Sequence, residues 1–261
     1  MQTRSICVNL LHCIKYRTQA VFLTIMMSTT TMNSSYRSPE VIASQYINSG
    51  VSHFECGNIE HAVAAFAEAL STSRQLLPTE QDSHDAAENI ILDGPETDEG
   101  PFQPQFGRSE MVKSAATDIC IFLNPIKIPD GLSLPSKKVH KTLSLITMFN
   151  LAICHHRNAI ENNMDKMYLR KALQLYELAY SIQVQGGIDM TLTPTMIIMS
   201  NVGHIHKILG NDDNAKQCFQ HLLSTLMFLI EAGERDRVWE FDGFFNNIMQ
   251  TIYAHSPAAA A

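Results

Sequence analysis

The sequence predicts an all-α protein built from antiparallel helical hairpins, and three observations support this fold class. Small residues recur beside bulky apolar ones at helical spacing, as in "NSGVSHFECGNIEHAVAAFAEAL", residues 48–70. A similar pattern returns twice later in the chain. The patterned stretches are separated by Gly and Asn, which favour helix ends and left-handed turns. These features predict a short helical array that is interrupted by an insertion and closed by a C-terminal capping helix.

Length and composition are those of a soluble globular protein. The chain has 261 residues, 45% of them hydrophobic and 17% charged, with a formal net charge of −7. Residues 78–107 contain eight acidic residues and no Lys or Arg. A nucleic-acid surface needs a basic stripe on a folded face, so we expect no nucleic-acid partner. No apolar run approaches the roughly 18 residues that cross a bilayer, so we expect no membrane span.

Residues 1–37 differ in composition from the rest of the chain. They are basic, contain no acidic residue and become rich in Ser and Thr toward their end. These traits predict either a disordered tail or a targeting segment. A cytoplasmic location is favoured, and mitochondrial or plastid targeting by the basic N-terminus is the alternative.

The first hairpin is predicted over residues 38–76. Ser38 can cap a helix, Pro39 suits its first turn and Glu40 suits the positive end of its dipole. This helix should run to about residue 56, and a second helix from residue 59 to about residue 76.

The middle of the chain interrupts the helical pattern. Residues 77–116 are dominated by Pro, Gly and acidic residues, which predicts a disordered insertion. Residues 117–134 include "ICIFLNPIKIP", which is rich in β-branched and aromatic residues and predicts one or two short strands or an extended segment. The sequence does not show what this segment packs against.

Helices resume in residues 135–256, and residues 257–261 form a short tail. We place the helices near residues 137–160, 166–184, 192–209, 212–232 and 236–254. Their breaks fall at Asn162-Asn163, Gly186-Gly187 and Gly210-Asn211.

Comparing the helices with one another reveals three copies of one hairpin pattern. Residues 46–70 align with residues 199–223, and a third copy is divided between residues 149–156 and 171–182. The pattern resembles the tetratricopeptide repeat (TPR), a helical hairpin of about 34 residues, which implies a right-handed solenoid. The positions that carry the resemblance are Tyr46, Gly50, Phe54, Gly57, Ala62, Phe66, Ala69, Ala152, Ala172, Tyr176, Ala179, Gly203, Gly210, Ala215 and Phe219. The style of the helices also resembles TPR-like proteins of diatoms, a likeness that implies no activity.

The alternation of small and bulky residues has a packing explanation. Small residues such as Gly50 and Ala62 allow the two helices of a hairpin to approach closely. We expect Phe54 and Phe66 to fill the gaps between successive hairpins. The last predicted helix has one apolar stripe and one polar side, the latter including Asn247, which suits a capping helix.

The TPR resemblance implies a candidate binding groove. In such arrays the first helix of each hairpin lines a concave face, where extended peptides bind. Asn48, Asn150 and Asn201 occupy one equivalent first-helix position, and an amide there can both donate to and accept from a peptide backbone. The alternative is that these amides bond their own neighbouring helices. Four further residues are expected on the same side: His156, Arg157, His204 and Lys207.

Residue chemistry gives no indication of catalysis, cofactor or metal. The chain contains none of the common nucleophile, phosphate-loop, dinucleotide or zinc-protease motifs. His204 and His206 are two residues apart on a predicted helix, so their side chains point about 200° apart and cannot chelate one ion together. The Lys and Arg residues that bind chaperone C-terminal tails are missing from the expected first-helix positions, so that partner class is disfavoured.

The sequence therefore predicts a non-catalytic scaffold that binds a protein or an extended peptide on its concave face. The alternative is a regulatory or structural module whose groove is filled by its own residues 117–130. A more remote alternative is a metal-dependent enzyme.

Overall fold

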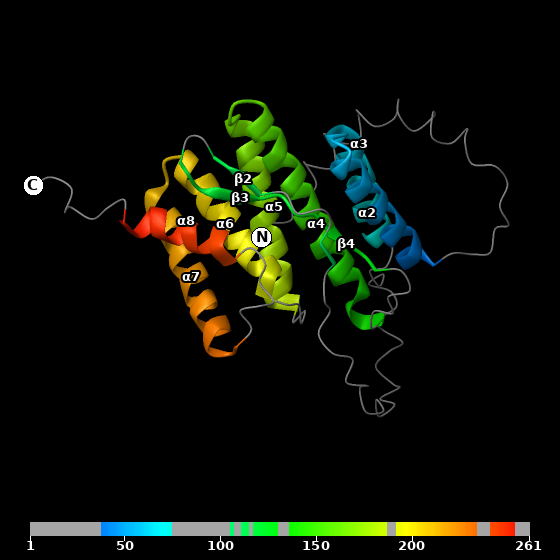
Figure 1. The fold of residues 1–261 in the computed structure, drawn as a ribbon. Coiled ribbons are helices and arrows are strands. Elements are labelled where there is room, and N and C mark those ends of the chain that lie inside the picture. Colours follow the sequence, from blue (N-terminus) through cyan, green and yellow to red (C-terminus); the bar gives the residue numbers. More distant parts are fainter. Residues whose placement is uncertain are drawn as a thin grey trace, which may run out of the picture.

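The computed structural model describes residues 38–74, 105–106, 111–114, 117–129, 136–186, 192–233 and 241–253. In these ranges three antiparallel helical hairpins follow one another and lead to a last helix, α8 (Figure 1). The hairpins are α2 (Pro39–Glu55) with α3 (Ile59–Arg74), α4 (Ser136–Glu161) with α5 (Lys166–Gly186), and α6 (Leu192–Ile208) with α7 (Asp212–Glu231), and α8 is Phe241–Tyr253. The all-α, TPR-like fold class is confirmed.

Most helices end where the sequence predicts, because the breaks contain residues that adopt left-handed backbone. Gly57 and Gly210 each have φ of +79° immediately after a first helix. In the second hairpin Asn163 takes this role, with φ of 52°. The predictions for residues 1–37 and 257–261 lie outside the described residues.

Each outer hairpin is held together by a ring that lies against a glycine. A Cβ atom added to Gly50 would lie 2.6 Å from the ring of Phe66, and one added to Gly203 would lie 2.7 Å from the ring of Phe219. Phe66 thus fills space inside its own hairpin, whereas we expected it between hairpins. The glycine removes the one side chain that would keep the two helices apart at that level.

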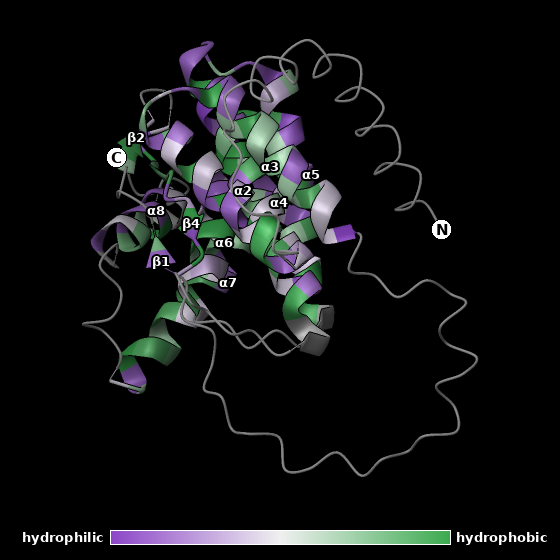
Figure 2. Ribbon diagram, turned by 90° about the vertical axis from the view of Figure 1, so that its right-hand side faces the viewer, coloured by the Kyte–Doolittle hydropathy of each residue, from purple (hydrophilic) through white to green (hydrophobic). Residues whose placement is uncertain are grey.

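The remaining small residues of the repeat pattern are buried as expected. The six alanines of the repeat pattern have no exposed surface. These alanines are Ala62, Ala69, Ala152, Ala172, Ala179 and Ala215. Tyr176, which occupies in the second hairpin the position of the phenylalanine rings, is also fully buried. The polar and apolar bands along the helices are visible in Figure 2.

Four short strands lie between the first and second hairpins in the sequence. They are β1 (Gln105–Phe106), β2 (Met111–Lys113), β3 (Cys120–Phe122) and β4 (Ile126–Lys127). β3 pairs with β2 and β4 pairs with β1, both antiparallel. The strands β3 and β4 agree with the predicted extended segment.

β1 and β2 fall inside residues 77–116, where we expected disorder, so that expectation is wrong for residues 105–106 and 111–113. Their partners are distant enough in sequence that local composition could not reveal the pairing. The rest of that insertion, except Ser114, lies outside the described residues.

The strands and helices share one hydrophobic core. Ile121, Phe122 and Ile126 of the strands are fully buried and belong to the same cluster as the ring of Phe66 and that of Phe219. The extended segment is therefore a core element of the array.

The glycine–ring contacts give a first test of this packing. Phe66→Ala and Phe219→Ala should each lower the free energy of unfolding by about 3–5 kcal/mol, because each leaves a cavity that a glycine cannot fill. The matched control is Phe228→Ala on α7, whose side chain is 61% exposed. That change should alter stability by no more than about 0.5 kcal/mol in the same chemical denaturation experiment. Equal losses for all three variants would contradict the repeat packing.

Candidate functional site

Residues 119–128, which we call the groove segment, lie against the first helices of the three hairpins and against α8. Figure 1 shows β3 and β4 crossing the helices from the side of α8 to the side of α2. Every residue of the groove segment is buried except Lys127, which is half-buried. Along the segment, from its N-terminal to its C-terminal end, the helices are met in the order α8, α6, α4, α2, which is the reverse of their order in the sequence.

Four asparagines, here called the asparagine ladder, hold the groove segment by its backbone. Each comes from a different helix: Asn48 from α2, Asn150 from α4, Asn201 from α6 and Asn247 from α8. In every case the side-chain oxygen accepts a backbone N–H and the side-chain nitrogen donates to the C=O of the same residue. Asn48 binds Ile128 with both bonds at 2.8 Å, Asn150 binds Ile126 at 2.8 and 2.9 Å, Asn201 binds Phe122 at 3.0 and 2.7 Å, and Asn247 binds Cys120 at 2.6 and 2.7 Å.

The bound residues are all even-numbered because an extended backbone presents alternate residues to the same side. The intervening residues face the other edge, where Ile121 pairs with Val112 of β2. Pro125 and Pro129, which have no N–H, both occupy odd positions. A shift of the segment by one residue would place Pro129 on Asn48, where it could not donate, so the prolines help to fix the register.

The ladder misses one even position, which is Asn124. Two residues separate the bound positions of α2 and α4, and two separate those of α6 and α8, but four separate Phe122 from Ile126. An extended chain advances about 3.3 Å per residue, so this interval contains up to about 13 Å of chain, against about 7 Å between the other neighbouring bound residues. Leu123, Asn124 and Pro125 are buried in this wider interval.

Neighbouring hairpins orient two of the ladder amides. The nitrogen of Asn201 also donates to the hydroxyl of Tyr176 at 2.9 Å, and that of Asn247 donates to the hydroxyl of Ser200 at 2.7 Å. Burial raises the pKa of Tyr176, so its hydroxyl stays protonated. Each of these asparagines therefore links its own helix, the preceding hairpin and the groove segment.

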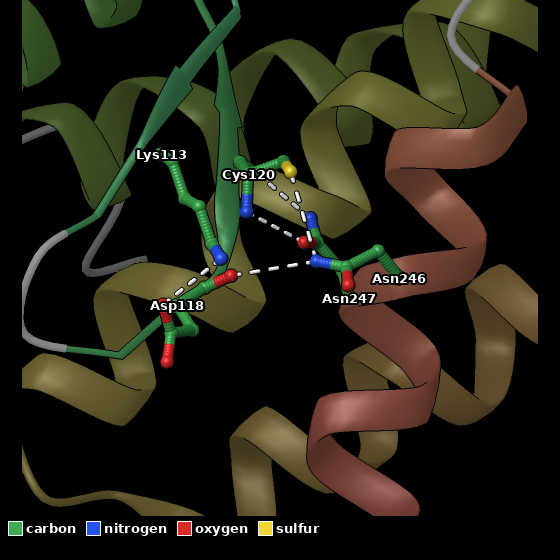
Figure 3. Close-up of polar contacts among 5 residues, drawn as sticks. All are labelled: Lys113, Asp118, Cys120, Asn246 and Asn247. Atoms are coloured by element: carbon green, nitrogen blue, oxygen red, sulfur yellow. Dashed lines mark hydrogen bonds and ion pairs between the residues drawn. The ribbon is translucent and has the colours of Figure 1, made fainter.

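The α8 end of the groove segment carries further polar contacts, shown in Figure 3. Beside Asn247, the amide of Asn246 lies 3.4 Å from the backbone oxygen of Asp118 and 3.7 Å from the sulfur of Cys120. Across the β2–β3 hairpin Lys113 forms an ion pair with Asp118 at 3.0 Å. Both side chains of this pair are largely exposed, so it contributes little to stability compared with the buried bonds of Asn247.

His156 and His204, expected in the groove, form a buried pair between α4 and α6. Nε2 of His156 lies 3.1 Å from Nδ1 of His204, and both side chains are completely buried. Their outward atoms, Nδ1 of His156 and Nε2 of His204, have no hydrogen-bond partner among the described residues. Burial lowers the pKa of His204 to about 4, and burial together with the neighbouring ring lowers that of His156 well below its ordinary value. Both rings are therefore neutral near pH 7, with one donating to the other.

Arg157 and Lys207, also expected in the groove, are engaged in ion pairs along the helices. Nε of Arg157 lies 2.9 Å from the carboxylate of Glu161, and its guanidinium lies over the ring of Phe54. Lys207 lies 2.7 Å from the carboxylate of Asp212. Of the residues expected to line the groove, the three asparagines come together on one ligand, whereas the histidines and the two cations serve contacts between and along helices.

Sequence reasoning missed Asn247 as a groove residue. We expected it on the polar side of a capping helix, yet it is completely buried. The sequence could have identified it: aligning the last helix with the first helices of the hairpins places Asn247 at the position of Asn48, Asn150 and Asn201. Within the described residues no three His, Cys, Asp or Glu side chains are arranged to hold a metal ion. The helices described here include none that is long and apolar enough to span a membrane.

Comparison with known proteins gives two matches, both to tetratricopeptide repeat families. One family matches residues 42–85, which include most of the first hairpin, and the other matches residues 198–225, which include most of the third. The chain resembles no curated protein and no solved structure closely enough to match. The matched residues contain Asn48 and Asn201, two members of the ladder.

The ladder can be tested with two adjacent asparagines. Asn247→Ala should lower the free energy of unfolding by about 2–4 kcal/mol, because it leaves the buried N–H and C=O of Cys120 without partners. Asn246→Ala, on the more exposed neighbouring position, should cost less than about 1 kcal/mol. Chemical denaturation of both variants measures the difference. A loss for Asn246→Ala as large as that for Asn247→Ala would contradict the role of the ladder.

The buried histidine pair predicts acid sensitivity. Below pH 6.5 the unfolded chain binds protons at these histidines while the folded chain does not, so stability should fall as pH decreases from about 6.5 toward 4. Each histidine contributes a slope of up to about 1.4 kcal/mol per pH unit. The double variant His156→Gln/His204→Gln should make the curve between pH 6.5 and 5 shallower. Parallel curves for the wild type and the double variant would contradict this account.

Proposed function

We propose that this chain, which is built on tetratricopeptide-like repeats, is a non-catalytic protein-binding scaffold whose concave groove is kept filled by its own residues 119–128. The asparagine ladder is the observation that carries this proposal. Four amides at equivalent positions bind one extended backbone, which is how a TPR groove would hold a peptide. We expect its partners to be proteins, and neither nucleic acid nor chaperone C-terminal tails.

The amount of buried surface favours a permanent over a displaceable occupant. Beyond its eight ladder bonds, the groove segment buries six large apolar side chains: Ile119, Ile121, Phe122, Leu123, Ile126 and Ile128. At about 1.5–3 kcal/mol for each, their burial contributes on the order of 10 kcal/mol. A domain of this kind has a total stability of about 5–15 kcal/mol, so releasing the segment would amount to unfolding the array.

This reasoning changes the expected location of the partner surface. The concave face of an open TPR array offers a backbone-binding groove to an external peptide. Here that groove is committed to the chain itself, so we infer that partners dock on the outer surfaces of the helices. The competing hypothesis is that an external peptide binds in the groove. It requires that residues 119–128 dissociate readily from the helices.

A labelled peptide with the sequence of residues 117–130 distinguishes the two hypotheses. The wild-type chain should not bind it at concentrations up to about 100 µM, because an occupied groove has no affinity to offer. Fluorescence anisotropy, with a scrambled peptide as control, makes the measurement. Micromolar binding of the matched peptide alone would favour the open groove.

Hydrogen exchange on the wild type supplies the second readout. Amides of Cys120, Phe122, Ile126 and Ile128 should exchange only through global unfolding, as slowly as those of the helical core. In the double variant Asn150→Ala/Asn201→Ala, protection of the segment and of the helices should fall together. Rapid exchange of these four amides beside protected helices would sink the proposal of a permanently filled groove.

A further inference from the structure

The asparagine ladder divides into two pairs, and the division falls between the second and the third hairpin. Asn48 and Asn150 bind the C-terminal part of the groove segment, and Asn201 and Asn247 bind its N-terminal part. Residues 123–125 join the two parts. The array therefore has a first half, α2 to α5, and a second half, α6 to α8, each with two ladder asparagines of its own.

Hydrogen bonds between side chains cross from the first half to the second at successive levels of α6. Three of them are Gln183–Thr195 at 2.9 Å, Tyr176–Asn201 at 2.9 Å and His156–His204 at 3.1 Å. Thr195 lies at the start of α6, where the chain arrives from α5, and His204 follows nine residues later, about 14 Å along the helix. A rotation of one half about this connection would therefore separate the histidines more than the other two pairs.

The histidine pair is the contact across this boundary that a proton can break. The rings of His156 and His204 lie 5.3 Å apart, centroid to centroid, and both are completely buried. In the neutral pair one of the two facing nitrogens donates and the other accepts. A first added proton places a charge in this buried site, and a second leaves two N–H groups that face and repel each other. Protonation therefore favours an arrangement of the halves in which water reaches the rings.

The side chains that the structure describes around the pair place no opposite charge against it. Tyr176 of α5 lies 6.1 Å from His156, between ring centroids, and burial raises its pKa, so it stays neutral. Glu177 of α5 faces Cys218 of α7, and burial followed by this carboxylate raises the pKa of the thiol to about 11. Residues 121–126 of the groove segment contain no titratable side chain.

On α4 and α6 themselves, the charged and titratable side chains beside the pair are neutral or have partners of their own. On α4 they are Arg157, which bonds Glu161, His155, which stacks on the ring of Tyr168, and Cys154, whose pKa is raised by burial. On α6 they are Lys207, which bonds Asp212, and His206, which lies 3.4 Å from Asn211. The causes of the low pKa values agree with this, since they are burial and then the His204 ring for His156, and burial for His204.

We propose that the boundary between the two halves is a proton-operated hinge, at which acid separates α4 from α6 while each half keeps its own part of the groove segment. Residues 123–125 then carry the bend between the two bound parts. The inference rests on the proposed function, because the groove must stay filled in both halves. It adds regulation: rotation of one half changes the spacing of the outer helix surfaces on which partners dock, so partner binding depends on pH.

The size of the effect follows from the protonation of the rings. An exposed imidazole with the ordinary pKa of about 6.5 is protonated about 30 to 1 at pH 5, whereas burial lowers the pKa of His204 to about 4 and keeps it mostly neutral. Protons therefore favour the open state as the pH falls. Between pH 7 and pH 5 each histidine that opening exposes should raise the ratio of open to closed molecules about 20-fold.

Distances between spin labels test the hinge in the full chain. Labels carried by unnatural amino acids at the exposed positions 60 on α3 and 217 on α7 lie in different halves. Pulsed electron resonance should give one distance at pH 7 and an additional, longer one at pH 5, while far-UV circular dichroism stays unchanged. The matched label pair at positions 60 and 174 lies within the first half and should keep its distance.

Histidine variants connect the opening to the pair. His156→Gln/His204→Gln should keep the pH 7 distance at pH 5. His204→Gln alone leaves one titrating ring, so its ratio of open to closed molecules at pH 5 should be about 20-fold below that of the wild type, which also serves if the double variant does not fold. The control is His140→Gln, because His140 lies 16 residues before His156, about 24 Å along α4, and this variant should open as the wild type does.

An unchanged distance between positions 60 and 217 from pH 7 to pH 5 would overturn the hinge. So would equal opening in the wild type and the histidine variants, or a loss of helical circular dichroism that accompanies the longer distance. The labelled peptide of residues 117–130 separates this proposal from the filled groove. Binding of the peptide at pH 5 alone would mean that acid releases the segment and that the hinge is wrong, whereas binding at pH 7 would contradict the filled groove itself.

Discussion

The structure depends on the match between a carboxamide and the backbone of an extended residue. An asparagine side chain presents one acceptor and one donor in a plane, and a peptide residue presents one donor and one acceptor in the complementary order. Four such pairs bring the first helices of the three hairpins and α8 onto one extended segment. Three of the four pairs, those of Asn150, Asn201 and Asn247, are buried. Losing one of these asparagines leaves a buried backbone N–H and C=O unsatisfied, which costs more than the bonds themselves contribute. Helix positions in the array are therefore tied to positions in the strand.

The ladder amides bind only backbone groups, so the side chains of the groove segment contribute through other interactions. Ile121 and Phe122 fill the core, and the ring of Phe122 lies 4.2 Å from that of Phe244, centroid to centroid. Gly243 permits this approach, because a Cβ there would meet the Phe122 ring at 2.9 Å. The prolines limit the register, and β2 covers the far edge of β3. The groove segment therefore has its own packing, register and edge protection within this chain.

Much of the helical architecture could be predicted from the sequence, since its determinants are local. The Gly50–Phe66 spacing and the turn at Gly57 both lie within one hairpin, and both carry their signal in residue type. The groove asparagines were also identifiable, because three of them recur in equivalent helices. What the sequence could not supply was the ligand: residues 120 and 247 are 127 positions apart, and no pattern announces that they meet. The strands β1 and β2 escaped prediction for the same reason, and the histidines were misplaced because helical periodicity alone does not separate the groove from the space between α4 and α6.

The four-residue step between Phe122 and Ile126 has a consequence for how such an array can change. In an ordinary solenoid each repeat touches only its neighbours, so repeats can be gained or lost one at a time and the ends can fray independently. Here the groove segment has a fixed length and offers one bound residue to each of the four asparagine-bearing helices. Inserting a hairpin would require a matching extension of the groove segment. Removing a hairpin would leave one residue of the segment without the asparagine that binds its backbone. Because Asn48 and Asn247 bind the same continuous segment, we expect the two ends of the array to fold and unfold together. We therefore expect this array to unfold as one cooperative unit, as a single globular domain does, and not repeat by repeat.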